Sequence, residues 1–204
     1  AFYRSYIATY LERDLRQILQ VSSLRDFERF VRACGLRSAQ LLNRTDLARD
    51  VGIAGSTAAA WLAVLDASGQ AVLLEPWFGN RTKSLVKSPK LYLRDAGLAS
   101  FLVGIRGPRD LAASPLAGAL WETLVFGEIR RLQVNTSGGW SLNFWRDRSR
   151  EADFLWHRAG RFELADAKWT ELPGAEDLTA LRRVAAELPR GSVDGLSIVC
   201  RSPH

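Results

Sequence analysis

After residue 115 the sequence changes between helical and strand periodicity, and the order of these changes restricts the fold more than any other feature. Leu120 and Leu124 recur at helical spacing, whereas Trp140, Leu142 and Phe144 occupy every second position, as in a strand with one buried face. The expected segments are a helix over 116–132, strands over 140–145, 151–157 and 161–169, a helix over 175–188 and a strand over 196–200. This α-β-β-β-α-β order predicts a mixed domain of α+β or α/β class.

The first half contains a second pattern, in which two short helices precede two strands. Helical periodicity before residue 36 predicts two further helices that support this unit. A helix-turn-helix followed by a β-hairpin is a winged helix. The expected elements are helices over 46–51 and 56–66, the first capped by Thr45 and the second opened by Ser56, and strands over 71–74 and 90–93.

The charge is divided unequally along the chain. Residues 1–114 contain 16 Lys and Arg against 10 Asp and Glu, whereas residues 115–204 contain 12 of each. This shift, next to Gly107-Pro108 and Ser114-Pro115, predicts two modules, 1–114 and 115–204. A basic first module favours a polyanion partner, and a proteome rich in arginine is the alternative explanation.

The wing of the predicted winged helix carries most of the lysines. Arg81, Lys83, Lys87 and Lys90 lie on or beside it, and we expect them to contact the phosphate backbone of DNA. The second helix, 56–66, has no Arg, Asn, Gln or Lys for bidentate contacts with bases, so it is not expected to read sequence. Winged helices also bind proteins, and this alternative stays open.

The segment 161–169 places a carboxylate and an amine side by side. Asp166 and Lys168 are two residues apart and therefore share a strand face, and Asp153 lies on the strand expected to pair with theirs. Glu122, on the preceding helix, can add another oxygen. Two close carboxylates can hold Mg²⁺, and Lys168 can position a nucleophile for phosphodiester hydrolysis. Alone, Asp166 and Lys168 are better explained by a surface ion pair.

Several classes of protein are excluded. No apolar run approaches the ~18 residues of a membrane span, and the first residues lack the pattern of a signal peptide. Two cysteines and two histidines provide neither a disulfide framework nor a zinc site. We therefore expect a cytoplasmic protein without a membrane partner. The absence of methionine, even at position 1, predicts that the sequence is part of a longer protein.

These residues support a family resemblance. Asp153 with Asp166-Ala167-Lys168 resembles the PD-(D/E)xK motif of the restriction-endonuclease-like superfamily, and Glu122 resembles the glutamate of its first core helix. The whole chain is similar to a prokaryotic domain-of-unknown-function family that follows an AAA+ ATPase module. The stretches that carry this similarity are 3–7, 10–15, 91–98, 118–122 and 150–154.

The resemblance implies a restriction-endonuclease-like core with Mg²⁺ held by Glu122, Asp153 and Asp166, and catalysis by Asp153, Asp166 and Lys168. It also implies an ATPase upstream, which would bind the ATP, since no G-x-x-x-x-G-K-[ST] motif occurs in these residues. The chain departs from the family at Ala167, where a branched apolar residue is usual, and at Asp166, where most relatives have Glu.

Three functions follow from the sequence. The first is a Mg²⁺-dependent, nuclease-like domain joined to a DNA-binding winged helix. The second is a non-catalytic platform that binds DNA or a protein and regulates the ATPase. The third is a regulatory or dimerisation unit without nucleic acid.

Overall fold

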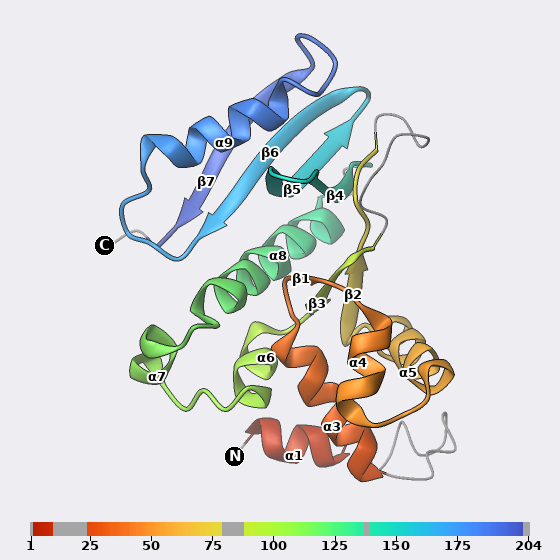
Figure 1. Ribbon diagram of the computed structural model, residues 1–204. Helices are drawn as coiled ribbons and strands as arrows, with labels where there is room; N and C mark the ends of the chain where they lie inside the picture. The colour runs from red at the N-terminus through yellow and green to blue at the C-terminus, as the bar shows by residue number, and fades with distance from the viewer. Residues whose placement is uncertain (1, 10–23, 79–87, 137–138, 202–204) are drawn as a thin grey trace.

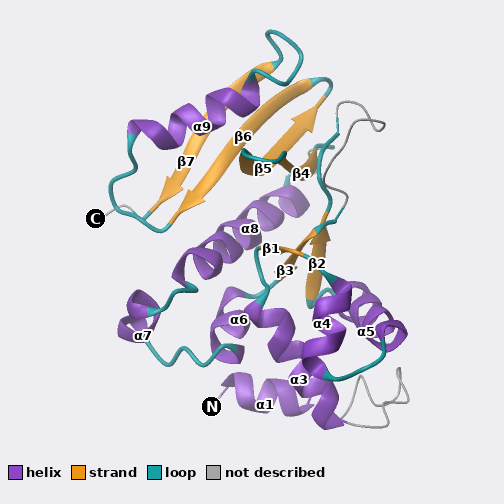
Figure 2. Cartoon of the chain, in the orientation of Figure 1, coloured by secondary structure: helices purple, strands orange, loops and turns teal. Residues whose placement is uncertain are grey.

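The computed structural model describes residues 2–9, 24–78, 88–136 and 139–201, and these form two sheets surrounded by helices (Figure 1). A three-stranded sheet belongs to the first half of the chain and a four-stranded sheet to the second. The helix α8 (Ala117–Asn135) lies between them (Figure 2). The molecule is therefore of mixed α+β class, as the periodicity predicts.

The first half is mainly helical. Buried aromatic side chains hold its helices together, since Phe27 and Phe30 each pack edge-on against Trp61. Its helices are α1 (Phe2–Thr9), α3 (Leu24–Leu36), α4 (Arg44–Val51), α5 (Gly55–Ala67), α6 (Ala96–Leu102) and α7 (Pro108–Ala113).

The two short helices predicted before the hairpin are confirmed, but their caps differ. The side chain of Asn43, not Thr45, accepts the N–H groups of Thr45 and Asp46 and caps α4. Asn is as good an N-cap as Asp or Ser, and Asn43 lies two residues before the predicted cap. The second helix, α5, follows Ala54, which makes no side-chain cap bond, so the predicted role of Ser56 is wrong by one residue.

The hairpin strands β2 (Ala71–Leu74) and β3 (Lys90–Leu93) agree exactly with the prediction and pair antiparallel. A third strand, β1 (Gln40–Leu41), pairs with the other edge of β3. The central strand of this sheet is therefore β3, and all four of its residues are buried. Two residues are too few to show a period, so β1 has no signal in the sequence.

The second half has the α-β-β-β-α-β order that the sequence predicts. Its elements after α8 are β4 (Ser141–Arg146), β5 (Glu151–Arg158), β6 (Arg161–Lys168), α9 (Ala175–Ala185) and β7 (Val193–Cys200). The strands lie in the order β4-β5-β6-β7, and only β7 is parallel to its neighbour. A parallel neighbour requires a crossover, which α9 provides, and α8 and α9 cover opposite faces of this sheet (Figure 1).

One irregularity in this sheet affects the site described below. Asn143 pairs with Leu155 and Trp145 with Ala152, so Phe144 alone opposes both Asp153 and Phe154. This is a β-bulge, which changes the direction of side chains in the bulged strand. Asp153 and Phe154 consequently both contact β3, although successive residues of a regular strand point to opposite faces.

The two halves share one core. The ring of Tyr92, on β3, stacks on Phe126 of α8 with centroids 4.1 Å apart. Trp77, just after β2, donates its backbone N–H to the carbonyl of Phe144 at 2.7 Å. The predicted division at 114/115 is therefore crossed by direct packing. Of the helices in the described ranges, none has the length and apolar character needed to cross a membrane.

Candidate functional site

The carboxylates predicted from the sequence meet beneath α8, where β3 approaches the bulge of β5. Glu122 lies on the face of α8 that also carries Val125 and Phe126, because residues three and four apart are neighbours on a helix. That face packs against the four-stranded sheet and directs Glu122 toward Asp153. The side chains of Glu122 and Asp153 are each 13% exposed.

Asp153 and Asp166 hold the ends of their two strands together. The backbone N–H of Asp153 donates to Asp166 Oδ1 at 3.0 Å, and that of Ala167 donates to Asp153 Oδ2 at 3.1 Å. These two bonds begin where the regular β5–β6 pairing stops, after Phe154 and Ala165. Each carboxylate thus satisfies a backbone N–H group in addition to any chemical role.

Lys168 lies at the accessible edge of this arrangement. Its Nζ is 3.5 Å from Asp166 Oδ2, and its side chain is 36% exposed whereas that of Asp166 is 5% exposed. Burial lowers the pKa of Lys168, but Asp166, Asp153 and Asp177 together raise it above its ordinary value. The amine is therefore a stable cation beside Asp166, as the predicted pair requires.

Lys90 has a different place from the one predicted. We expected it on the wing, in contact with nucleic acid, but it is only 2% exposed and points into the carboxylate cluster. Its Nζ lies 2.8 Å from Glu122 Oε1, 3.0 Å from Asp153 Oδ1 and 2.5 Å from Glu151 Oε1. The prediction was wrong because α8 and β4 cover β3, all four of whose residues are buried, so its first residue faces the interior rather than solvent.

Two further members of the cluster were missed. Glu151 opens β5, and its second oxygen pairs with Arg146 at 2.8 Å. The buried hydroxyl of Tyr92 donates to Glu122 Oε1 at 2.5 Å. Lys90 and Tyr92 are two residues apart on one strand and therefore share a strand face. The two-residue period that predicts Asp166 beside Lys168 also predicts this pair.

The cluster has more negative than positive charge at its buried end, and burial together with this excess raises the pKa of two of its carboxyl groups. Burial and the neighbouring Asp153 raise the pKa of Glu122 to about 7, although Lys90 and Tyr92 lower it. Burial and Asp153 likewise raise the pKa of Asp166 to about 6, against the effects of the Asp153 N–H and Lys168. For Lys90, burial lowers the pKa, but Asp153, Glu122 and Glu151 raise it above the ordinary range.

These residues do not fit Mg²⁺ in their present arrangement. Both oxygens of Asp153 are engaged, one by Lys90 and the other by the N–H of Ala167. Glu122 Oε1 accepts from both Lys90 and Tyr92. Within the described ranges, no three His, Cys, Asp or Glu side chains form a group that could hold a metal ion. The predicted ligands Glu122, Asp153 and Asp166 do converge, but an ammonium group lies between two of them.

The other predicted nucleic-acid contacts are not located. Arg81, Lys83 and Lys87 lie outside the described residues. Their expected contact with phosphate therefore stays a prediction from the sequence.

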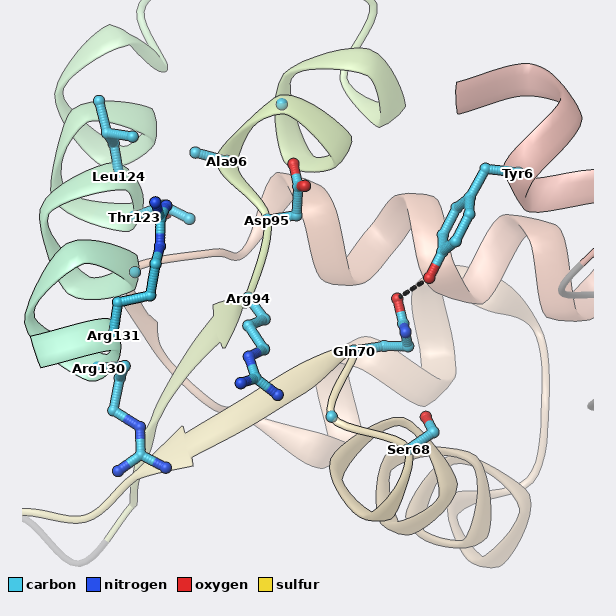
Figure 3. A pocket seen from close by; sticks show the side chains of 13 residues that line it. Tyr6, Ser68, Gln70, Arg94, Asp95, Ala96, Thr123, Leu124, Arg130 and Arg131 are labelled. Atoms are coloured by element: carbon cyan, nitrogen blue, oxygen red, sulfur yellow. Dashed lines mark hydrogen bonds between the residues drawn. The ribbon is translucent and has the colours of Figure 1, made fainter. Parts of the chain in front are cut away.

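A separate pocket of about 550 Å³ lies on the opposite side of α8 and is lined by three arginines, Arg94, Arg130 and Arg131 (Figure 3). Arg130 and Arg131 follow Gly127 by one helical turn. A Cβ at Gly127 would lie 3.3 Å from the carbonyl oxygen of Arg94, so this glycine permits the close approach of α8 to the end of β3. No local sequence pattern groups these arginines, since 35 residues lie between Arg94 and Arg130.

The arginines differ in their partners. Arg131 Nη2 lies 2.7 Å from Glu128 Oε1, and Arg130 donates to the side-chain oxygen of Gln133. For Arg94, no carboxylate of the described residues lies within ion-pair distance. On the far side of the pocket the hydroxyl of Tyr6 donates to Gln70 at 2.9 Å (Figure 3). The pocket is thus polar, and its lining has three guanidinium groups and one carboxylate, that of Asp95.

Comparison with known proteins yields uncharacterized relatives. Uncharacterized protein Rv2008c of Mycobacterium tuberculosis and uncharacterized protein Mb2031c of Mycobacterium bovis are each 32% identical to this chain over 169 residues. The matched region covers 82% of this chain but 37% of each relative, so the chain spans little more than a third of their length. No solved structure matches the chain.

Two family profiles match successive parts of the sequence. The profile described as Domain of unknown function (DUF4143) matches residues 117–203, which contain Glu122, Asp153, Asp166 and Lys168. The other profile matches residues 1–109, which contain Lys90, Tyr92 and Arg94. Both the cluster and the arginine pocket therefore draw residues from both regions. Because the latter profile covers more than half of the chain, the protein belongs to the family described as Domain of unknown function (DUF8612).

Proposed function

We propose that this chain is a non-catalytic, DNA-binding platform within a longer protein, in which a winged helix and a nuclease-like core form one unit. The observation that carries the proposal is the pocket formed by Arg94, Arg130 and Arg131 where the two regions meet. The expected ligand is the phosphodiester backbone, which this pocket would bind without regard to base sequence.

The chemistry of the pocket supports this ligand. A guanidinium group is planar and always charged, and its N–H groups match two oxygens of one phosphate. Arg94 is exposed and has no acidic partner among the described residues, so phosphate would not need to displace a carboxylate from it. The net charge of +6 for the whole chain adds a general attraction to polyanions.

The arrangement of elements supports the two fold assignments. In the first half, α4 and α5 are followed by the antiparallel pair β2 and β3, which is the order of a winged helix. In the second half, the α-β-β-β-α-β order and the mixed sheet agree with the resemblance to restriction endonucleases. The shared fold does not imply shared activity, because function depends on the site.

Binding to labelled duplex DNA across a range of KCl concentrations tests the proposal. Arg94→Gln combined with Arg130→Gln should weaken binding severalfold and reduce the slope of log K against log salt by about one per lost phosphate contact. Arg109→Gln is the matched control, because Arg109 is exposed on α7 and lies outside the pocket. Equal affinity and slope in all variants would refute the pocket as the DNA site.

The same assay examines the wing. Changing Arg81, Lys83 and Lys87 to Gln should lower affinity further if the winged helix contacts the backbone beside the pocket. If only the wing variant loses affinity, DNA binds through the wing alone and the pocket serves another purpose.

A second candidate function is a Mg²⁺-dependent nuclease. It is favoured by one observation, the closeness of Asp153, Asp166 and Lys168. Incubation with linear and supercoiled DNA and Mg²⁺ or Mn²⁺ distinguishes the two candidates. Cleavage that disappears in both Asp153→Ala and Asp166→Ala would support a nuclease instead of a non-catalytic platform. Cleavage retained in both variants would indicate contamination.

The relatives supply the wider context of the proposal. They are much longer than this chain. The resemblance seen in the sequence implies a phosphate-loop ATPase before these two regions. We therefore include an upstream ATPase as the partner that DNA binding would regulate. Measuring ATP turnover of the longer protein with and without DNA tests this: the Arg94 and Arg130 changes should abolish any stimulation by DNA.

A further inference from the structure

We infer that the ammonium group of Lys90 is a built-in cation that occupies the place of a divalent metal ion in the carboxylate cluster, and that removing it converts the cluster into a divalent-cation site. This inference is independent of DNA binding. It concerns the charge balance of the cluster, and it accounts for the disagreement between the predicted Mg²⁺ ligands and the observed contacts.

The contacts of Lys90 match the capacity of an ammonium group. Such a group has three N–H donors and no acceptor. Lys90 Nζ has three carboxylate partners, one oxygen each from Glu122, Glu151 and Asp153, at 2.8, 2.5 and 3.0 Å. Every donor is therefore used within the cluster, and every partner is charged.

The remaining surroundings of Lys90 exclude solvent. Its Nζ lies 5.6 Å from the centroid of the Phe144 ring, and its side chain is 3% exposed. Since a buried charge is tolerated only when it is paired, removing Lys90 alone would leave its acidic partners without their shared cation. An entering metal ion would need the oxygens that already bind Nζ.

Without Lys90 the same oxygens would suit a hard cation. Carboxylates are the preferred ligands of Mg²⁺ and Mn²⁺. Glu122, Glu151 and Asp153 would then face one another without the ammonium group, and Arg146 would remain beside Glu151. A divalent ion would restore the balance that the ammonium group provides. The lysine and the acids come from different regions, 1–109 and 117–203, so Lys90 also joins the two regions by charge.

The test compares the full chain with Lys90→Met, and with Lys168→Met as the matched control. Met retains much of the length and the apolar character of the lysine stem without its charge. Titration with Mn²⁺ by isothermal calorimetry should show saturable binding of one ion to Lys90→Met and none to the wild type or to Lys168→Met. Adding Asp153→Asn to Lys90→Met should weaken that binding at least tenfold. Melting temperatures with Mn²⁺ or Mg²⁺ should rise for Lys90→Met alone.

Two results would overturn the inference. One is saturable, Asp153-dependent Mn²⁺ binding by the wild type, which would show that Lys90 does not block the site. The other is a folded Lys90→Met protein that neither binds Mn²⁺ nor gains melting temperature from it.

A folding defect also gives a definite answer. Recovery of folded Lys90→Met only when Mn²⁺ is present supports the inference directly. If Lys90→Met folds under neither condition, the double variant Lys90→Met/Glu122→Gln removes one negative charge with the positive one. Folding of the double variant without metal supports charge compensation by Lys90, and its failure to fold refutes that role. DNA binding is measured separately, so its failure would leave this test unaffected.

Discussion

The two lysines of the carboxylate cluster have the same chemistry and opposite surroundings. Lys90 begins a central strand, is covered by α8 and has three acidic partners, whereas Lys168 ends a strand and is about one-third exposed beside Asp166. The packing around each strand decides this difference, since α8 and β4 cover the start of β3 whereas the end of β6 is left partly open. Only the Lys168 end can meet a substrate or ligand from outside.

The largest expected effect concerns the sealed end. Lys90→Met should lower the free energy of unfolding by about 3–5 kcal/mol, because it leaves buried carboxylates without their cation. Urea denaturation at pH 7.5 without divalent ions measures this. A loss below about 1 kcal/mol would mean that Lys90 is not essential to the charge balance, and the contrast between the two lysines would disappear.

The next effect is a dependence of stability on pH. The pKa of Glu122 is raised from 4.5 to about 7 in the folded protein, so between these values the folded chain holds a proton that the unfolded chain has lost. The free energy of unfolding therefore decreases as pH rises through this window and becomes constant above it. Asp166, raised from 3.8 to about 6, adds a decrease of the same sign at lower pH.

Between pH 4.5 and 7.5 we expect the wild type to lose about 3 kcal/mol through Glu122 and about 2 kcal/mol through Asp166. Glu122→Gln should remove most of the change above pH 6, because an amide has no proton to lose. Urea titrations at several pH values provide the measurement. A wild-type stability that increases over this range would contradict the raised pKa of Glu122.

A smaller loss is expected for Tyr92→Phe. This change removes the hydroxyl that donates to Glu122 but keeps the ring stacked on Phe126. A hydrogen bond to a charged group contributes about 1.5–3 kcal/mol, and we expect the lower part of that range because Lys90 still donates to the same oxygen. Denaturant unfolding measures the loss. The comparison is Tyr6→Phe, which removes a hydroxyl that bonds to Gln70 at a partly buried site.

The smallest effect belongs to the accessible end. Lys168→Met should change the free energy of unfolding by less than about 1 kcal/mol, since ion pairs near the surface contribute little. If Lys168→Met instead loses as much stability as Lys90→Met, the two lysines contribute equally to stability. The difference in their exposure would then not explain their contributions.

Local periodicity predicts much of the fold and part of the cluster. The hairpin strands and the order of elements after residue 115 follow from side-chain alternation, and Asp153, Asp166 and Lys168 meet as their strand positions imply. The place of Lys90 does not follow, because it depends on how α8, β4 and β5 pack against β3, and these elements are distant from β3 in the sequence. The bulge that turns Asp153 toward Lys90 is likewise a property of strand register, which is set only when β4 and β5 pair.

The interior position of β3 also bears on how these two regions can be inherited. A gene that encoded only residues 117–203 would produce a sheet without Tyr92 against Phe126 and an acidic cluster without its internal cation. Recombination between the regions would therefore be tolerated only if the new neighbour supplied an equivalent aromatic ring and an equivalent amine. The boundary between the two family profiles therefore does not divide the protein into separable parts, because the core and the charged cluster both cross it.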